Sequence, residues 1–177
     1  MAIRRALGAS APVILAVALG ACGSQPDPFG HDTTPGQECI PLAGHQVVTY
    51  GFEAVRNRAA GTAVIDKMAL AKRKGLHVIA TWVVPSTEDL YGAQYGYPPG
   101  HMPLNGWHWD KRQPANGARV PHSRGKYDRM NLLFVVALQA RVTRGSAIGV
   151  DVWYHVGSNY YHLRTETGLV LVAGSGC

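Results

Sequence analysis

The chain has 177 residues, of which 46% are apolar and 16% are charged, and its formal charge at pH 7 is +6. This length suits one domain and is too short for two domains with separate cores. The share of apolar residues excludes a chain that is disordered by composition.

An export signal is expected over residues 1–21. Arg4 and Arg5 form a positive n-region, and an apolar stretch follows over 11–19; small residues then precede a cleavage site. The apolar stretch is shorter than the roughly 20 residues that a membrane-spanning helix needs. The segment Leu19-Gly20-Ala21-Cys22 resembles the lipobox of bacterial lipoproteins. That resemblance implies a Cys22 that is acylated and becomes the new N-terminus.

Lipidation of Cys22 predicts a protein anchored to the cell membrane on its extracytoplasmic face. A diacyl group would supply two chains, which is what stable anchoring by lipid generally requires. An ordinary secretory signal that contains a cysteine is the alternative, and both a general and a twin-arginine export route stay open. Cleavage removes Arg4 and Arg5 but none of the 11 acids, which leaves 15 basic side chains and a charge of +4.

Two cysteines remain after the lipidated one. Cys39 precedes the first strand-like segment, and Cys177 is the last residue of the sequence. Because an exported protein lies where disulfides persist, we expect these two to form one bridge. The bond would enclose almost the whole domain.

Residues 22–38 are expected to form a flexible tether. The stretch contains Pro26, Pro28 and Pro35 among glycines and polar residues, and Phe29 is its only bulky apolar side chain. This composition favours a linker over a packed element. We therefore place the folded domain at 39–177.

The chain then takes on the period-two pattern of β-strands. Val48, Tyr50 and Phe52 share one face of the first strand, and Gly157-Ser158-Asn159 forms a tight hairpin. Seven short strands separated by turns predict an all-β domain, a single immunoglobulin-like antiparallel β-sandwich. The strands begin near residue 46 and then cover 62–70, 76–84, 132–142, 147–156, 160–165 and 169–172.

Tryptophans on two predicted strands are expected to pack in the core. Trp82 lies in phase with Leu76 and Val84 on the strand 76–84, which we expect to end at Pro85. Trp153 lies on the strand 147–156. Large aromatic side chains on half-buried strands are more often core residues than ligand platforms.

One long excursion, residues 86–130, breaks the strand pattern. It is rich in proline and glycine and shows neither the strand nor the helix period. Loops of this length in compact domains are uncommon and are often functional. If the chain has a ligand site, we expect it here.

Histidine and methionine in the excursion suggest a metal site. His101, Met102, His108 and His122 could bind a soft metal such as copper, because copper accepts imidazole and thioether ligands. However, adjacent His101 and Met102 cannot easily face one ion, and no free cysteine completes an electron-transfer site. We favour the alternative in which tyrosines and tryptophans pack the loop on the sandwich and the histidines are solvated.

The excess positive charge lies in one part of the excursion. Residues 111–129 carry six basic side chains and one acid, so the rest of the mature chain has a charge of −1. The basic side chains are interleaved mainly with proline, glycine and histidine and not with a series of stacking aromatic rings, so no nucleic acid is expected. An anionic lipid surface or wall polymer is the expected partner, and a solvated loop without a partner is the simpler alternative. The basic residues are Lys111, Arg112, Arg119, Arg124, Lys126 and Arg129.

Motifs of common enzyme classes are absent from the sequence. It has no Gly-x-Ser-x-Gly elbow, Walker loop, His-Glu-x-x-His or Gly-x-Gly-x-x-Gly. His155 and His162 flank the predicted hairpin, and we expect them to approach across the two strands as a structural pair. We therefore expect a non-catalytic protein without a cofactor, and an enzyme ranks third among the alternatives.

Further segments resemble those of secreted lipoproteins from high-GC Gram-positive (actinobacterial) bacteria. They are Asn57-Arg58, Gly61-Thr62-Ala63-Val64-Ile65-Asp66, Gly75-Leu76, Val84-Pro85 and Gly149-Val150-Asp151-Val152-Trp153-Tyr154. The resemblance implies a cell-surface location and carries over no functional residue beyond Cys22. We expect a membrane-anchored binding or interaction module, with a copper- or other metal-binding lipoprotein as the alternative.

Overall fold

The structure is a computed structural model that describes residues 27–31, 35–86, 90–98, 108–125 and 128–177. Of the candidate site residues named above, Cys22, His101, Met102 and Lys126 lie outside these ranges. The described part contains thirteen strands and one 3-10 helix of three residues. No helix in the described ranges is long and apolar enough to cross a membrane. The prediction of an all-β domain is confirmed.

The strands follow the chain in order, and the seven predicted ones are all present. The predicted segments correspond to β3 (Val48–Asn57), β4 (Ala63–Leu70), β5 (Leu76–Ser86), β9 (Arg129–Leu138), β11 (Val150–Val156), β12 (Asn159–Arg164) and β13 (Thr167–Val172). The other elements are β1 (Phe29–His31), β2 (Gly36–Pro41), β6 (Gly92–Tyr95), the 3-10 helix η1 (Trp109–Lys111), β7 (Gln113–Pro114), β8 (Arg119–Val120) and β10 (Arg144–Ala147).

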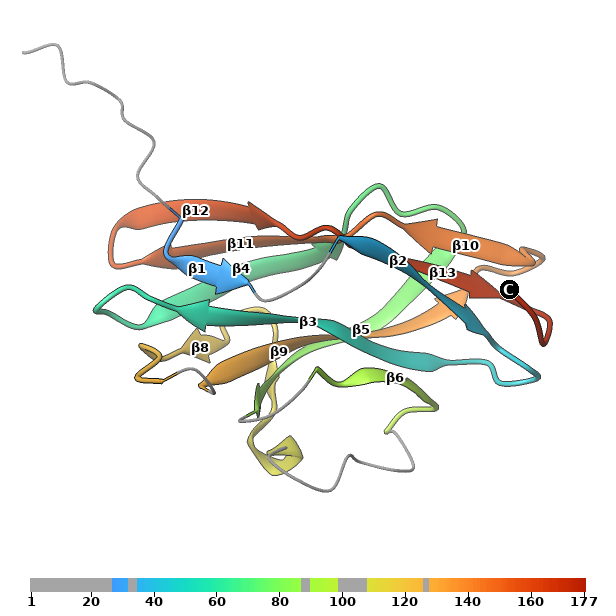
Figure 1. The fold of residues 1–177 in the computed structure, drawn as a ribbon, viewed down its shortest axis with the longest axis horizontal. Helices are drawn as coiled ribbons and strands as arrows, with labels where there is room; N and C mark the ends of the chain where they lie inside the picture. Colours follow the sequence, from blue (N-terminus) through green and yellow to red (C-terminus); the bar gives the residue numbers. More distant parts are fainter. Residues whose placement is uncertain (1–26, 32–34, 87–89, 99–107, 126–127) are drawn as a thin grey trace, which may run out of the picture.

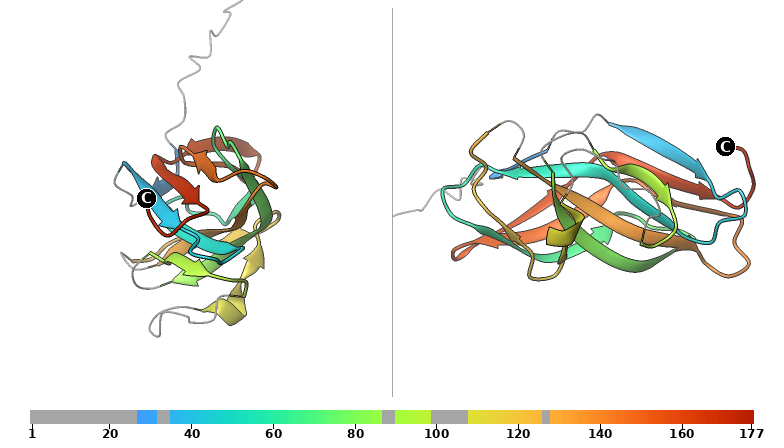
Figure 2. Two further views of the ribbon diagram at one scale, coloured as in Figure 1. Left: turned by 90° about the vertical axis from the view of Figure 1, so that its right-hand side faces the viewer. Right: turned by 90° about the horizontal axis from the view of Figure 1, so that it is seen from below.

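Three sheets form the two layers of the sandwich (Figures 1 and 2). The first has the order β1-β3-β9-β5-β7, with β6 also paired to β3, and the others have the orders β12-β11-β4-β8 and β10-β13-β2. The strand pairs are antiparallel except for β2 and β13, which run parallel. The main core lies between the layers and takes side chains from all three sheets.

Strand β9 is buried on both faces. Leu132, Phe134 and Val136 point into the main core, and Leu133 belongs to a second cluster with Val84 and Tyr91. A strand covered on both sides reads as a continuous apolar run, as Leu132 to Val136 does. Both layers of packing therefore depend on this strand.

Part of the expected tether belongs to the sandwich. Phe29 of β1 pairs with Asn57 and is 3% exposed, and its ring stacks on Tyr154 with a centroid distance of 3.8 Å. Strand β2 begins at Gly36 and pairs with β13. The folded domain therefore begins before Cys39, because strand pairing and one buried ring outweigh a composition that favours a linker.

The excursion 86–130 contains regular structure, whereas the sequence shows no strand or helix pattern there. It contributes β6, β7, β8 and η1, which pair with or pack against β3, β4 and β5. Its Tyr91 covers the outer face of the first sheet, where Gly51 leaves room for the Tyr91 and Leu133 side chains. The excursion thus extends two of the sheets at their edges and covers part of the outer face of the first sheet, and its strands are too short to show a period.

The two ends of the sandwich carry different turns. The hairpin end carries the turn 58–62 between β3 and β4 and the turn 157–158 between β11 and β12. The distal end carries the turns 71–75 and 139–143, and Figure 1 shows the C-terminus toward this end. Cys39 and Cys177 form a disulfide that joins β2 to the last residue, with a Cα–Cα distance of 6.0 Å.

Candidate functional site

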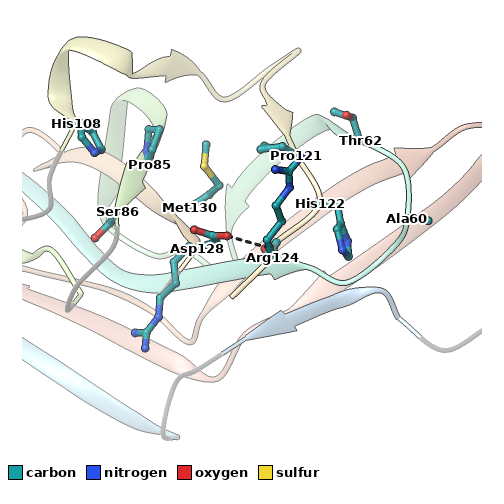
Figure 3. A pocket seen from close by; sticks show the side chains of 12 residues that line it. Ala60, Thr62, Pro85, Ser86, His108, Pro121, His122, Arg124, Asp128 and Met130 are labelled. Atoms are coloured by element: carbon teal, nitrogen blue, oxygen red, sulfur yellow. Dashed lines mark hydrogen bonds between the residues drawn. The ribbon is translucent and has the colours of Figure 1, made fainter. Parts of the chain in front are cut away.

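A pocket of about 580 Å³ opens at the hairpin end, between the end of β5 and the segment that follows β8 (Figure 3). Four separate parts of the chain line it, and three of them belong to the excursion or its borders. Met130, 6% exposed, connects the pocket to the main core. The lining residues are Ala60, Thr62, Pro85, Ser86, His108, Pro121, His122, Ser123, Arg124, Asp128, Arg129 and Met130.

Asn57, fully buried at the end of β3, holds one wall of the pocket together. Its Nδ2 donates to the carbonyl oxygens of Gly61 at 2.7 Å and Val120 at 2.9 Å, and its Oδ1 accepts the N–H of Ala59 at 3.0 Å. These bonds fasten the turn 58–62 to β8. The backbone carbonyl of Asn57 also accepts the N–H of Ser123 at 2.8 Å, so the segment after β8 is held by the same residue.

Two of the histidines singled out from the sequence lie at this pocket. His122 has its Nδ1 2.7 Å from the carbonyl oxygen of Ala59. A carbonyl only accepts, so Nδ1 donates and Nε2 is left as the second ring nitrogen. His108 is held by its backbone N–H, which donates to the carbonyl oxygen of Pro85 at 3.3 Å. Figure 3 shows His108 and His122 on opposite sides of the pocket.

Two arginines and one acid supply the fixed charges of the pocket. The carboxylate of Asp128 accepts the backbone N–H of Arg124 at 2.9 Å and thus closes the loop between them. Among the described residues, no hydrogen bond or ion pair involves the Arg124 guanidinium, and this side chain is exposed. With Arg129 also on the lining, positive side chains outnumber negative ones. The pocket is therefore suited to an anionic group.

The structure describes two of the four candidate metal ligands. His108 and His122 share the pocket, whereas His101 and Met102 lie outside the described residues. Over those residues, no group of three or more histidine, cysteine, aspartate or glutamate side chains is placed to hold a metal ion. The structure thus places two of the four candidate metal ligands at one cavity, on opposite sides of it.

The described basic residues of 111–129 do not all lie at one place. Arg112 lies over two indoles, with its Cζ 5.3 Å from the centre of Trp82 and 5.0 Å from that of Trp109. Such cation–π stacking gives Arg112 a packing role. Arg119 lies on β8, paired with Val64, and its backbone bonds to the side chain of Gln113. Among the described basic residues of this stretch, only Arg124 and Arg129 line the pocket.

An ionic network on the outer face of the β12-β11-β4 sheet is not among the sequence predictions. Arg164 binds the Asp151 carboxylate through Nε at 2.7 Å and Nη2 at 2.9 Å, and His162 Nε2 lies 2.8 Å from the same carboxylate. The hydrogen bond from Arg164 holds the pKa of Asp151 below its ordinary value. Trp153 stands between His162, with ring centres 4.7 Å apart, and the Lys67 ammonium at 4.8 Å. Trp153 therefore lies on the outer face of the sheet, whereas the sequence analysis predicted that it packs in the core.

The histidines of this sheet do not pair with each other, and that prediction is wrong. The hairpin register places His155 opposite Tyr160 and His162 opposite Trp153. His155 instead has its Nδ1 2.9 Å from the carboxylate of Asp66, at the irregular pairing between β4 and β11. Counting residue pairs outward from the turn 157–158 gives the correct cross-strand partners of both histidines. The contact with Asp66 depends on a bulge that no local pattern marks.

Comparison with known proteins gives no assignment. No protein-family model and no curated protein sequence matches the chain. Among solved structures, the ASH / PapD-like domain of human CEP192 (PapD-like domain 7) is 8% identical, over 94% of this chain and 100% of that one, with a TM-score of 0.39. That likeness is too distant to carry an inference about ligands or partners.

Proposed function

We propose that the protein is a lipid-anchored, extracytoplasmic binding module and that the pocket at the hairpin end is its ligand site. The ligand carries a phosphate or carboxylate group. The lipobox ending at Cys22 supports the anchor. The all-β fold supports a module in which loops at one end of a rigid sandwich bind the ligand.

One observation carries the choice of ligand. The Asp128 carboxylate is engaged by the backbone N–H of Arg124, while the Arg124 guanidinium has no partner among the described residues. An exposed guanidinium at the mouth of a cavity presents its donors in a fork that matches phosphate and carboxylate oxygens. The two histidines at the same pocket add donors for such a group.

Binding is favoured over catalysis because the histidine–carboxylate pairs lie elsewhere. Asp66 and Asp151 hold His155 and His162 on the outer face of the β12-β11-β4 sheet, and none of these four residues lines the pocket. At the pocket, His122 is bonded to a backbone carbonyl. A general base oriented by a carboxylate, the usual arrangement for nucleophilic catalysis, is therefore not part of the described pocket.

Metal binding is the second candidate, because His108 and His122 line one cavity. Titration of the mature protein with copper, followed by His122→Ala, distinguishes it from anion binding. Stoichiometric copper binding that disappears in the variant would favour the metal. Phosphate binding that persists in the presence of a chelator would favour the anion.

The anchor is tested by labelling cells with radioactive palmitate. We expect label in the wild-type protein and none in Cys22→Ser, with Ser24→Ala as the matched control that keeps the label. The wild-type protein should also partition into the detergent phase of a Triton X-114 extract, and Cys22→Ser into the aqueous phase. Equal labelling or equal partition of the two proteins would refute the anchor.

The pocket is tested by titrating the mature protein in non-ionic detergent with inorganic phosphate and glycerol phosphate. We expect saturable binding that is weakened in Arg124→Ala and retained in Arg124→Lys. Arg73→Ala, at an exposed arginine of the distal end, is the matched control and should bind like the wild type. Binding that is unaffected by Arg124→Ala would refute the assignment of the site.

A further inference from the structure

We infer that the hairpin end of the sandwich rests on the bilayer and that its pocket binds the phosphate of an anionic phospholipid headgroup. This inference rests on the proposed anchor at Cys22. It adds an orientation and a second membrane contact to that anchor, and it names the source of the anionic group.

The chain leaves the sandwich at the hairpin end. The Tyr154 hydroxyl donates to the Asp27 carboxylate and accepts the N–H of Phe29 at 3.1 Å. The carbonyl oxygen of Pro28 accepts the N–H of Arg58, in the turn 58–62, at 2.9 Å. Together with the stacking of Phe29 on Tyr154, these bonds fix residues 27–29 beside the turn that also lines the pocket.

The tether that remains between the lipid and this fixed point is short. Five residue steps lead from Cys22 to Asp27. Since an extended chain spans at most about 3.6 Å per residue, Asp27 lies within roughly 18 Å of the lipidated residue. A tether of this length keeps the first described residues close to the headgroups, whatever its conformation.

The same arithmetic excludes the opposite orientation. Strand β3 alone has ten residues and runs from the distal end to the hairpin end. At about 3.3 Å per residue it is roughly 33 Å long, which exceeds the reach of the tether. The distal end therefore cannot face the bilayer while residues 27–29 stay bonded, whereas the hairpin end can.

Charge at the hairpin end favours an anionic membrane. Arg58 and Arg119 are exposed near the pocket arginines Arg124 and Arg129. Two of the acids here, Asp27 and Asp128, already accept hydrogen bonds from Tyr154 and from the backbone. An anionic leaflet attracts each nearby basic side chain, and the attraction falls off within about a Debye length. The short tether lets these arginines come within that range.

An aromatic side chain lies at the same end. Tyr160 follows the turn 157–158 and is 77% exposed, the highest value among the exposed large apolar side chains of the described residues. Tyrosine is enriched at membrane–water interfaces, where its ring contacts the acyl boundary and its hydroxyl stays hydrated. The exposure of Tyr160 is thus explained by a bilayer on this side.

The inference is tested with the mature chain carrying Cys22→Ser, which has no acyl chains. Flotation is measured with vesicles of phosphatidylcholine alone and with phosphatidylglycerol as about a third of the lipid. We expect binding only to the second, binding that falls as salt is raised, and a roughly fivefold loss for Arg124→Ala. Arg124→Lys should restore most of the binding, and Arg73→Ala should leave it unchanged.

Soluble glycerol phosphate, inorganic phosphate and a polyglycerol phosphate polymer distinguish the sources of the anion. The inference is supported if each of these three soluble anions reduces the binding of the protein to the anionic vesicles by occupying the pocket. Binding to the polymer or to inorganic phosphate without binding to the vesicles overturns it and leaves the proposed pocket function standing. Vesicle binding that Arg124→Ala does not weaken overturns the pocket as the contact. Failure of every anionic probe refutes the pocket function as well, and palmitate labelling tests the anchor independently.

Discussion

The hydroxyl of Tyr154, on β11, donates a hydrogen bond to the carboxylate of Asp27, and so ties the start of the described chain to the centre of a sheet. The two residues are 127 positions apart in sequence. The bond sets the distance between the proposed lipidation site, Cys22, and the sandwich, because it removes the residues after Asp27 from the tether. It is therefore the contact on which the proposed orientation of the domain depends.

Tyr154→Phe should loosen this attachment with little change to the core. The variant keeps the ring that stacks on Phe29 but loses the hydroxyl bonded to Asp27 and to the N–H of Phe29. We expect a loss of about 1–2 kcal/mol in the free energy of unfolding. Because the N–H of Phe29 keeps its other acceptor, Asp27 Oδ1 at 2.8 Å, hydrogen exchange at this amide should become faster through the loosening of Asp27 and not through the loss of every acceptor. Unchanged protection of that amide would contradict the anchoring role.

Alkaline pH should destabilise the protein. Burial raises the pKa of Tyr50, Tyr91 and Tyr154 above their ordinary value of 10.0, and the Glu53 and Asp27 carboxylates add to the effect at Tyr50 and Tyr154. Above pH 10 the unfolded state loses these protons and the folded state keeps them, so stability falls as pH rises. Absorbance at 295 nm should show Tyr50, Tyr91 and Tyr154 ionising only on unfolding. Tyr154→Phe should reduce the slope of stability against pH, and an unchanged slope would contradict this assignment.

Asn57→Ala should damage both stability and the pocket. The variant loses the bonds to Ala59, Gly61 and Val120, and we expect a cost of about 2–3 kcal/mol with loss of phosphate binding. Asn131→Ala is the matched control, since Asn131 is equally buried and neither of its amide atoms has a partner within the described residues. Denaturant unfolding and phosphate titration of both variants check this. Equal effects of the two substitutions would count against the role of Asn57.

Removal of the disulfide should have a large effect on stability. The bond between Cys39 and Cys177 closes a loop with a sequence separation of 138. In the chain-entropy account, such a loop contributes about 5 kcal/mol, chiefly by restricting the unfolded state. Reduction should lower the unfolding midpoint of the wild type and leave that of Cys39→Ala/Cys177→Ala unchanged. A wild-type midpoint that does not respond to reduction would contradict the pairing.

The strands that could be predicted from the sequence are the long ones. Alternation or an unbroken apolar run marks β3, β4, β5, β9 and β11, whereas β6, β7 and β8 have four residues or fewer and show no period. Bulges limit even the long strands. In β5 the register shifts between Val78 and Ala80, so Leu76 reaches the main core while Trp82 and Val84 face the second cluster.

The site could be predicted only in part for a similar reason. The excursion was expected to hold it, and His108, His122, Arg124 and Arg129 do lie together there. One wall of this pocket depends on Asn57, whose side chain joins the turn 58–62 to β8 by reaching residues 4 and 63 positions away. A single asparagine at the end of a strand has no sequence pattern that distinguishes this role. Only the structure therefore shows that the candidate histidines and the candidate arginines line one pocket.

The orientation of the domain is tested most directly by depth-dependent quenching in the lipidated protein. A fluorophore is attached to Ser158→Cys, in the turn of the hairpin end, or to Thr143→Cys, in a turn of the distal end, with the protein anchored in vesicles that carry nitroxide-labelled headgroups. Both positions are exposed. We predict strong quenching at position 158 and little at position 143. Equal quenching at the two positions, or stronger quenching at position 143, would contradict the account.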